Sequence, residues 1–232
     1  MALRSSRTAL VTGGNRGIGF EVCRQLAARS YKVVLGARDL AKGEAAAKAI
    51  AGDVRPIALD VGDSAAPKRA LDELRDQGIH IDVLVNNAAV HYDTWQNVEN
   101  ADWAIVREAF EINLFGAWRM AQAVAPMMRE AGWGRIVNVS SESGSLASMG
   151  GGTPAYATSK AALNALTRVL AAELSGTGIL VNAVCPGWTA TDMGGRGGRP
   201  IIEGTASVLW AVELPDDGPS GGFFRDGKPL PW

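Results

Sequence analysis

The chain contains 232 residues, of which 47% are hydrophobic, and its formal net charge is −1. A chain of this size can bury one large core, so we expect residues 1–232 to form a single domain. The balanced, interspersed charges indicate neither nucleic-acid binding nor attachment to a membrane. Residues 1–7 lack an apolar signal core and the chain has only two cysteines, so we expect a cytoplasmic protein. The two cysteines and two histidines do not have the spacing of metal ligands, so we expect no metal site.

Strand-like and helix-like segments alternate along the whole chain. Strands are predicted at residues 9–12, 32–36, 55–60, 83–86, 135–139 and 180–184, with a short last strand near Phe223. Helices are predicted at residues 18–28, 40–51, 65–77, 102–130, 155–175 and 201–213. Most strand runs show no polar alternation, which is typical of strands covered by helices on both faces. The pattern predicts an α/β fold with a doubly wound, Rossmann-like parallel sheet of about seven strands, whose ligand lies at the carboxyl ends of the strands.

The first predicted strand leads directly into a glycine-rich turn and then a helix. The turn has the spacing Thr-Gly-x-x-x-Gly-x-Gly between Thr12 and Gly19. A strand, a glycine-rich turn and a helix in this order point helix N-terminal amides and the positive end of the helix dipole at a pyrophosphate. Glycine is needed where the backbone turns tightly or approaches a phosphate closely. The residues predicted to bind a dinucleotide here are Gly13, Asn15, Arg16, Gly17, Ile18 and Gly19.

The end of the second strand bears on the choice between NAD and NADP. Dinucleotide sites that prefer NAD place an acidic side chain there, which accepts a hydrogen bond from the ribose 2′-hydroxyl. Here Arg38 is the first side chain able to reach the ribose, and a guanidinium suits a 2′-phosphate. Arg16 could approach the same phosphate from the other side. Asp39 would favour NAD if it faced the ribose, but we interpret it as the N-cap of the next helix, so NADP (NADPH) is the predicted cofactor.

Tyr156 and Lys160 are four positions apart and form the clearest candidate for proton transfer. Thr153 as N-cap and Pro154 at the first helical position predict a helix that begins just before Tyr156. Positions i and i+4 lie on one helix face, so the ammonium can sit near the phenol oxygen. A neighbouring cation lowers the phenol pKa from its ordinary value of ~10. The pair therefore predicts a tyrosine that acts as a general acid/base near neutral pH.

These motifs together resemble the short-chain dehydrogenase/reductase family, in its compact, single-domain, carbonyl-reductase-like form. The resemblance continues along almost the whole chain, although Ala89 stands where the family has glycine. Further matching segments are Asn-Asn-Ala-Ala at residues 86–89, Glu-Ile-Asn-Leu around Asn113, Arg-Ile-Val-Asn-Val-Ser-Ser ending at Ser141, Pro-Gly-Trp-Thr-Ala-Thr at residues 186–191 and the tail at residues 221–229.

The resemblance implies a role for each catalytic residue. Tyr156 would donate a proton to the substrate oxygen or remove it in the oxidative direction, and Lys160 would lower the pKa of Tyr156 and bind the nicotinamide ribose. Ser141 would polarise the substrate oxygen by hydrogen bonding. Asn113 would hold a water that links Lys160 to solvent. Ser140 is a rival to Ser141, but the family residue is the second serine of this pair.

The resemblance also implies further contacts with the cofactor. Asp60 and Val61 resemble the adenine-binding pair of the family, and Tyr156 and Lys160 also belong to the cofactor site. The remaining implied cofactor-binding residues are Asn87 and Ala88 after the fourth strand and Pro186, Gly187, Thr189 and Thr191 in the segment that holds the nicotinamide. Glycines follow Thr191, and we expect residues 188–204 to form a loop that covers the substrate.

The implied activity is the reversible, NADPH-dependent reduction of a ketone or aldehyde to an alcohol. One alternative is a redox-inactive relative that binds NADP as a regulatory ligand, against which the intact Ser141, Tyr156 and Lys160 argue. A second alternative is an NAD-dependent secondary alcohol dehydrogenase. The substrate itself stays open. Because the helix at residues 102–130 and the helix of Tyr156 pair subunits in the family, we expect a homodimer or homotetramer.

Overall fold

The computed structural model describes residues 6–232. The prediction that residues 1–7 lack a signal core therefore falls mostly outside the described residues. Eight strands form one sheet in the order β3-β2-β1-β4-β5-β6-β7-β8. The strands are β1 (Thr8–Thr12), β2 (Lys32–Ala37), β3 (Val54–Ala58), β4 (Val83–Asn86), β5 (Gly134–Val139), β6 (Ile179–Val184), β7 (Phe223–Arg225) and β8 (Lys228–Pro229).

Neighbouring strands are parallel throughout, except that β8 runs antiparallel to β7. The predicted doubly wound α/β fold is therefore confirmed, with one strand more than the expected seven. The extra strand contains two residues, and one of them is Pro229. Proline has no amide hydrogen for a ladder and is confined to sheet edges, which is where β8 lies.

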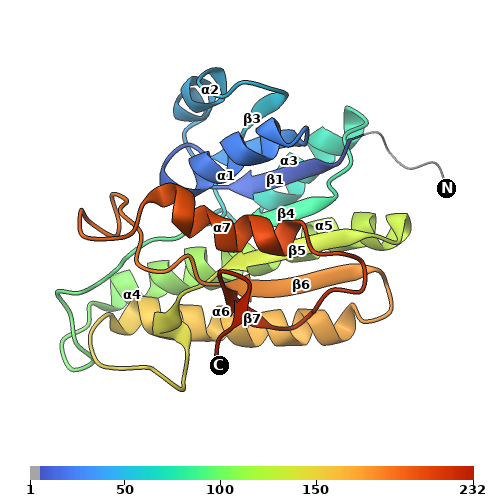
Figure 1. Cartoon of the computed structure of the whole chain (residues 1–232). Coiled ribbons are helices and arrows are strands. Elements are labelled where there is room, and N and C mark those ends of the chain that lie inside the picture. The colour runs from blue at the N-terminus through green and yellow to red at the C-terminus, as the bar shows by residue number, and fades with distance from the viewer. Residues whose placement is uncertain (1–5) are drawn as a thin grey trace.

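Helices cover both faces of the sheet. They are α1 (Gly17–Ala28), α2 (Leu40–Lys48), α3 (Ala66–Asp76), α4 (Trp103–Phe110), α5 (Ala117–Ala131), α6 (Pro154–Glu173) and α7 (Ile201–Val212), with a short 3₁₀ helix η2 (Glu142–Gly144). Helices α1 and α7 lie side by side over one face (Figure 1), and α3, α5 and α6 pack on the other.

Alternate residues of β1 belong to different hydrophobic cores. Leu10 packs in the core that α3, α5 and α6 close, whereas Ala9 and Val11 pack in the core that α1, α2 and α7 close. All five residues of β1 are buried. A parallel strand with both faces buried has no polar side, which explains the continuous apolar runs in the sequence.

The long helix predicted over residues 102–130 is present as a continuous helical stretch at residues 103–131, but it is not α-helical throughout. A π-helical segment, η1 (Glu111–Gly116), separates α4 from α5. Asn113 in this segment bonds through its side chain to the backbone of Val90, outside the helix. Gly116 passes so close to Val61 that an added Cβ would lie 2.8 Å from the Val61 Cβ. Such π segments are frequent at functional sites, and this one brings Asn113 toward α6.

The strand order reverses beside β1, which lies between β2 and β4. Chain connections leave the carboxyl ends of β1 and β4 toward opposite sides at such a point, and a crevice opens between them. The fold therefore places the turn after β1 and the segment after β4 on the two walls of one crevice. In the described part of the chain, no helix combines the length and hydropathy needed to cross a bilayer.

Candidate active site

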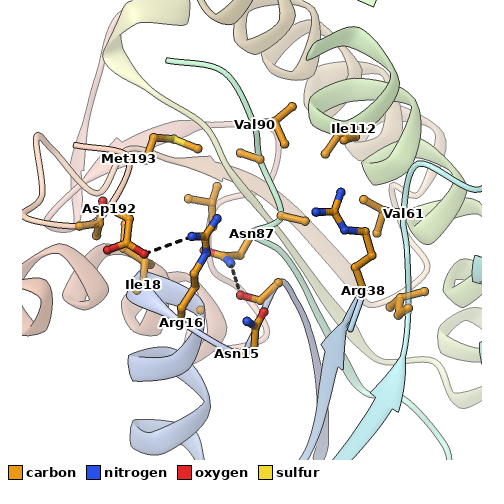
Figure 2. A pocket seen from close by; sticks show the side chains of 18 of the residues that line it. Asn15, Arg16, Ile18, Arg38, Val61, Asn87, Val90, Ile112, Asp192 and Met193 are labelled. Atoms are coloured by element: carbon orange, nitrogen blue, oxygen red, sulfur yellow. Dashed lines mark hydrogen bonds and ion pairs between the residues drawn. The ribbon is translucent and has the colours of Figure 1, made fainter. Parts of the chain in front are cut away.

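A cavity of about 440 Å³ opens at the carboxyl ends of the strands. Its walls come from the turn between β1 and α1, the ends of β2 and β3, the segment after β4, helix α6 and the loop after β6 (Figure 2). Most of the predicted site residues therefore meet in one place. Those that line the cavity are Gly13, Asn15, Arg16, Gly17, Ile18, Gly19, Arg38, Asp60, Val61, Asn87, Ala88, Tyr156, Lys160, Pro186 and Thr191.

The glycine-rich turn is held in a shape that only glycine accepts easily. Gly13 and Gly17 have φ angles of 65° and 55°, in the left-handed region. A Cβ at Gly19 would lie 2.4 Å from the Gly13 carbonyl oxygen, so the helix start packs directly on the turn. The Asn87 side-chain amide donates to the carbonyls of Thr12 and Gly13 at 2.9 and 3.2 Å. The first turn of α1 is thereby fixed at the cavity edge.

The end of β2 brings Arg38 and Asp39 to the same cavity. The Asp39 carboxylate accepts a hydrogen bond from the Lys42 amide at 3.3 Å, which confirms its interpretation as the N-cap of α2. Figure 2 shows the Arg38 guanidinium turned into the cavity beside Val61. The Asp39 carboxylate is thus bound to the helix start, whereas the Arg38 guanidinium makes no ion pair or hydrogen bond with residues 6–232 and can meet a ligand anion.

Arg16 lies on the other side of the cavity and faces Asp192. Its guanidinium is 3.1 Å from the Asp192 carboxylate, in an ion pair whose side chains are 71% and 78% exposed. The pair connects the glycine turn to the loop after β6. Nothing in the local sequence pattern predicts this role of Asp192, because its partner lies 176 positions earlier in the chain.

Asp60 and Val61, the predicted adenine-binding pair, lie in the turn after β3. The Asp60 carboxylate accepts from the Gly62 amide at 3.0 Å, which rigidifies the turn. Val61 is buried against η1. Both residues line the cavity, and Figure 2 shows Val61 beside Arg38, a position compatible with the implied contact to an adenine ring.

Tyr156 and Lys160 are both buried in the first turns of α6. The Lys160 ammonium donates to the Val139 carbonyl at 2.7 Å and lies 5.6 Å from the centroid of the Tyr156 ring. Burial lowers the pKa of Lys160 to about 8. Burial also raises the pKa of the Tyr156 phenol, against the opposing effect of a hydrogen bond with Ser141. The expectation that the lysine lowers the phenol pKa is therefore wrong for this structure, because desolvation outweighs the favourable contacts.

The two adjacent serines have different surroundings. Ser140 is buried and its hydroxyl donates to the Asn164 side chain at 2.6 Å. Ser141 is half-buried, accepts from the Ser143 amide at 3.2 Å, and interacts with the Tyr156 phenol. Ser140 lines the cavity, although its hydroxyl is bonded to Asn164, whereas Ser141 lies outside the lining and interacts with the Tyr156 phenol. The choice of Ser141 over Ser140 therefore stays a prediction.

Asn113 lies behind the cavity wall. Its carbonyl oxygen accepts from the Val90 amide at 2.8 Å, and its amide group donates to the Val90 carbonyl at 3.2 Å and to the Ser159 hydroxyl at 3.0 Å. These contacts tie η1 and the segment after β4 to α6. The implied role of Asn113 in holding a water next to Lys160 stays a prediction.

Two predicted cofactor residues, Gly187 and Thr189, do not belong to the cavity lining. The buried Thr189 hydroxyl donates to the carbonyls of Pro186 and Gly187 at 3.2 and 3.1 Å. Gly187 has a φ of 72° and packs against the Arg199 side chain. Both residues therefore shape the loop that carries Pro186 and Thr191.

The start of α6 differs from the prediction in one respect. Thr153 does occupy the N-cap position, but its backbone is left-handed, with φ 54° and ψ 48°, and its side chain makes no capping hydrogen bond within residues 6–232. The Asp93 carboxylate bonds instead to the amides of Ala155 and Tyr156. The sequence analysis missed Asp93, because it precedes the helix by about sixty positions and no local signal points to it.

Two aromatic contacts lie near the predicted site residues. The Tyr92 and Tyr156 rings meet edge to face, with centroids 5.2 Å apart and an interplanar angle of 86°. Trp188 donates from its indole nitrogen to the Gly194 carbonyl at 2.7 Å and lies across its own loop. Among the described residues, no group of three or more His, Cys, Asp or Glu side chains is placed to hold a metal ion.

Comparisons with known proteins agree with this geometry. A family model described as short chain dehydrogenase matches residues 7–199. The chain is 36% identical to an acetoacetyl-CoA reductase of Cupriavidus necator, over 82% of this chain and 77% of the relative. It is 31% identical to carbonyl reductase [NADPH] 1 of Bos taurus, over 98% and 99% of the two chains.

Solved structures show the same similarity. An NADPH-bound carbonyl reductase from chicken fatty liver superposes with a TM-score of 0.84 at 29% identity, over 98% of this chain and 99% of that chain. Salutaridine reductase from Papaver somniferum superposes with a TM-score of 0.83 at 31% identity, over 95% and 99%. The family match, the relatives and the shared fold lead to one conclusion: the chain belongs to the short-chain dehydrogenase/reductase family of oxidoreductases and is carbonyl-reductase-like.

Proposed function

We propose that this protein catalyses the reversible, NADPH-dependent reduction of a ketone or aldehyde to an alcohol. The observation that carries the proposal is that Tyr156 and Lys160 line the same cavity as the glycine turn and Arg38. A group suited to proton transfer and a turn suited to a dinucleotide thus share one cavity. That arrangement is what hydride transfer to a carbonyl needs, since the substrate oxygen must receive a proton as its carbon receives hydride.

The cavity fits a dinucleotide in size and in chemistry. Its volume of about 440 Å³ lies in the range of ordinary ligand pockets, roughly 300–1,000 Å³. The turn from Gly13 to Gly19 and the N-terminus of α1 would hold the pyrophosphate, and Asn87, Pro186 and Thr191 lie where the nicotinamide half would extend. The nicotinamide ring supplies hydride chemistry when it is bound.

Three features favour NADPH over NADH. Arg38 offers a guanidinium to a 2′-phosphate, with which it can form charge-assisted hydrogen bonds. The competing Asp39 carboxylate is engaged with the Lys42 amide. The similar carbonyl reductase from chicken is NADPH-bound, which supports the same choice here.

Proton transfer would use Tyr156. Because burial raises the phenol pKa, the hydroxyl stays protonated at neutral pH and can donate to a substrate oxygen. Ser141, which interacts with the same phenol, can donate a second hydrogen bond to that oxygen and stabilise its developing charge. Lys160 keeps a positive charge beside Tyr156 through its bond to the Val139 carbonyl.

The substrate would enter beneath residues 188–204. Arg199 anchors the base of this segment through an ion pair of 3.0 Å with Asp226. The segment also reaches the glycine turn through Asp192 and Arg16. We therefore propose that this segment of the single domain covers a small carbonyl or alcohol substrate, in a cytoplasmic enzyme.

Tyr156→Phe is expected to lower turnover by ~10²-fold or more, because it removes the proton donor and keeps the ring. NADPH affinity should change little. Steady-state assays with a panel of ketones and aldehydes, together with a fluorescence titration of NADPH, measure both quantities. Near-normal turnover in this variant would contradict the mechanism.

Reductive turnover should depend on pH in the alkaline range. Reduction needs the Tyr156 proton and the Lys160 charge, and the pKa of Lys160 is about 8. Reductive turnover should therefore fall as the pH rises above about 8, where Lys160 loses its charge. Pre-steady-state rates of carbonyl reduction across the alkaline range test this. A reductive rate that increases with pH would refute the assignment of the proton donor.

Arg38→Ala should weaken NADPH binding by ~10- to 100-fold, since a hydrogen bond to a charged group contributes roughly 1.5–3 kcal/mol. NADH binding should stay nearly the same. Arg16→Ala should act in the same direction but more weakly, because Arg16 already pairs with Asp192. Parallel titrations of both cofactors, with Arg75→Ala as a charge-matched control far from the cavity, provide the measurement.

Two results would overturn the cofactor assignment. An equal loss of affinity for both cofactors in Arg38→Ala would make Arg38 a structural residue. A wild-type preference for NADH would mean that Asp39 turns from its helix to the ribose and that the enzyme is an NAD-dependent alcohol dehydrogenase.

We also propose that the protein is a homodimer or homotetramer. Large apolar side chains are exposed along α4, η1, α5 and α6, namely Trp103, Phe115, Trp118 and Val169. Large apolar side chains left exposed on these helices favour association with a second copy of the chain. Light scattering at micromolar concentration should give a mass at least twice that of the chain, and Trp118→Glu should reduce it. A monomeric wild type would contradict the proposal.

A further inference from the structure

We propose that Asp93 is a positioning residue for Tyr156: its carboxylate sets the first turn of α6 and so fixes where the phenol lies. The inference rests on the proposed function in one respect, that Tyr156 transfers the proton. Asp93 lies in the segment after β4, outside α6, and does not line the cavity. Its effect on the reaction therefore has to pass through the helix.

The Asp93 carboxylate is fully buried, with 0% of the residue exposed, and uses both oxygens on α6. One oxygen accepts from the Ala155 amide at 3.0 Å, and the other accepts from the Tyr156 amide at 3.0 Å. The first amides of a helix have no partners within the helix, and they are ordinarily satisfied by the N-cap side chain. Asp93 takes that role from a distant part of the chain.

The local sequence does not secure this helix start. Thr153 has a φ of 54°, which is unfavourable for a β-branched residue, and its side chain caps no amide within residues 6–232. Three glycines, at residues 150–152, precede it and add no constraint of their own. A carboxylate at a helix N-terminus is also favoured by the helix dipole. Removal of Asp93 would leave two buried amides unsatisfied, with no local group to replace it.

Asp93 is itself held between two helix starts. The Gln96 side chain donates to the Asp93 carboxylate at 3.2 Å and accepts from the Asp102 amide, at the N-cap of α4, at 2.7 Å. The neighbouring Tyr92 ring meets the Tyr156 ring edge to face. The segment after β4 thus holds Tyr156 at two points, its backbone amide and its ring.

The position of Tyr156 in the helix makes this contact matter for the reaction. Tyr156 is the third residue of α6, within the turn that frays first when a cap is lost. Lys160 lies one turn deeper and is anchored to the Val139 carbonyl. Loss of Asp93 should therefore displace the phenol while Lys160 and the dinucleotide cavity stay in place. A displacement of about 1 Å in a reacting group can cost ~10²-fold in rate.

Asp93→Asn and Asp93→Ala test the proposal. In Asp93→Asn one amide keeps an acceptor while the other faces an NH₂ group, so we expect kcat to fall by about 10-fold, and by up to ~100-fold in Asp93→Ala. The Kd of NADPH should stay within about twofold in both, because Asp93 itself does not line the cavity and the glycine turn, Arg38 and Lys160 keep their places. Hydrogen exchange at the amides of Ala155 and Tyr156 should become faster.

Asp102→Ala is the matched control for Asp93→Ala. It removes the carboxylate that caps α4 by accepting from the Ala104 amide at 2.8 Å, and it does not touch Tyr156. It should lower stability about as much as loss of a helix cap does elsewhere, with kcat close to wild type. If this control lowers kcat as much as Asp93→Ala does, the loss reflects general destabilisation and the proposal fails.

A double substitution separates this proposal from the proposed function. In the Tyr156→Phe background, Asp93→Asn should cause no further loss of kcat, because the group that it positions is absent. Multiplicative losses, or a normal kcat in both single Asp93 variants, would overturn the positioning role. Failure of the proposed function would appear differently, as near-normal turnover in Tyr156→Phe alone. If Asp93→Ala does not fold, Asp93→Asn and the amide exchange decide the question.

Discussion

The hydrogen bonds between Asn87 and the end of β1 are the constraint on which the whole site depends. The Asn87 amide group donates to the Thr12 and Gly13 carbonyls, while the Thr12 hydroxyl accepts from the Asn87 backbone amide. Gly19 then packs on Gly13 with no room for a side chain. These contacts join two strands, a turn and a helix start at the point where the strand order reverses. The helix amides are consequently fixed at the crevice edge before any ligand arrives, which is the preorganisation that anion binding requires.

On the opposite wall of the cavity, burial determines the pKa values of Lys160 and Tyr156. Lys160 keeps its ammonium in the interior because the Val139 carbonyl accepts from it, and the cost of desolvation appears as a pKa near 8. Burial raises the pKa of Tyr156, because it favours the neutral, protonated form of the phenol. The wall therefore combines a protonated phenol with a lysine that loses its charge as the pH rises above about 8. Two side chains from outside α6 bond to this helix: Asn113 of η1 donates to the Ser159 hydroxyl, and Asp93 of the segment after β4 accepts from the Tyr156 amide.

Local patterns predicted the parts of the site that are determined locally. The glycine spacing, the buried strands and the cap at Asp39 all depend on neighbours in sequence, and the structure agrees with each. Other features depend on contacts between distant segments. The π segment around Asn113 follows from a bond to Val90, and the start of α6 follows from Asp93. The direction of the Tyr156 pKa shift also needed the structure, because it depends on burial and not on spacing.

The central claim is that hydride passes from NADPH to a carbonyl carbon while the protein delivers the proton. Deuterium transfer tests it most directly. NADPH that carries deuterium at the transferable position of the nicotinamide is incubated with the wild-type protein and a reducible ketone, and the alcohol is examined by mass spectrometry and NMR. The account predicts a product with deuterium on the carbinol carbon and an unlabelled hydroxyl. Turnover without deuterium at that carbon, or no consumption of NADPH with any ketone or aldehyde, would contradict it.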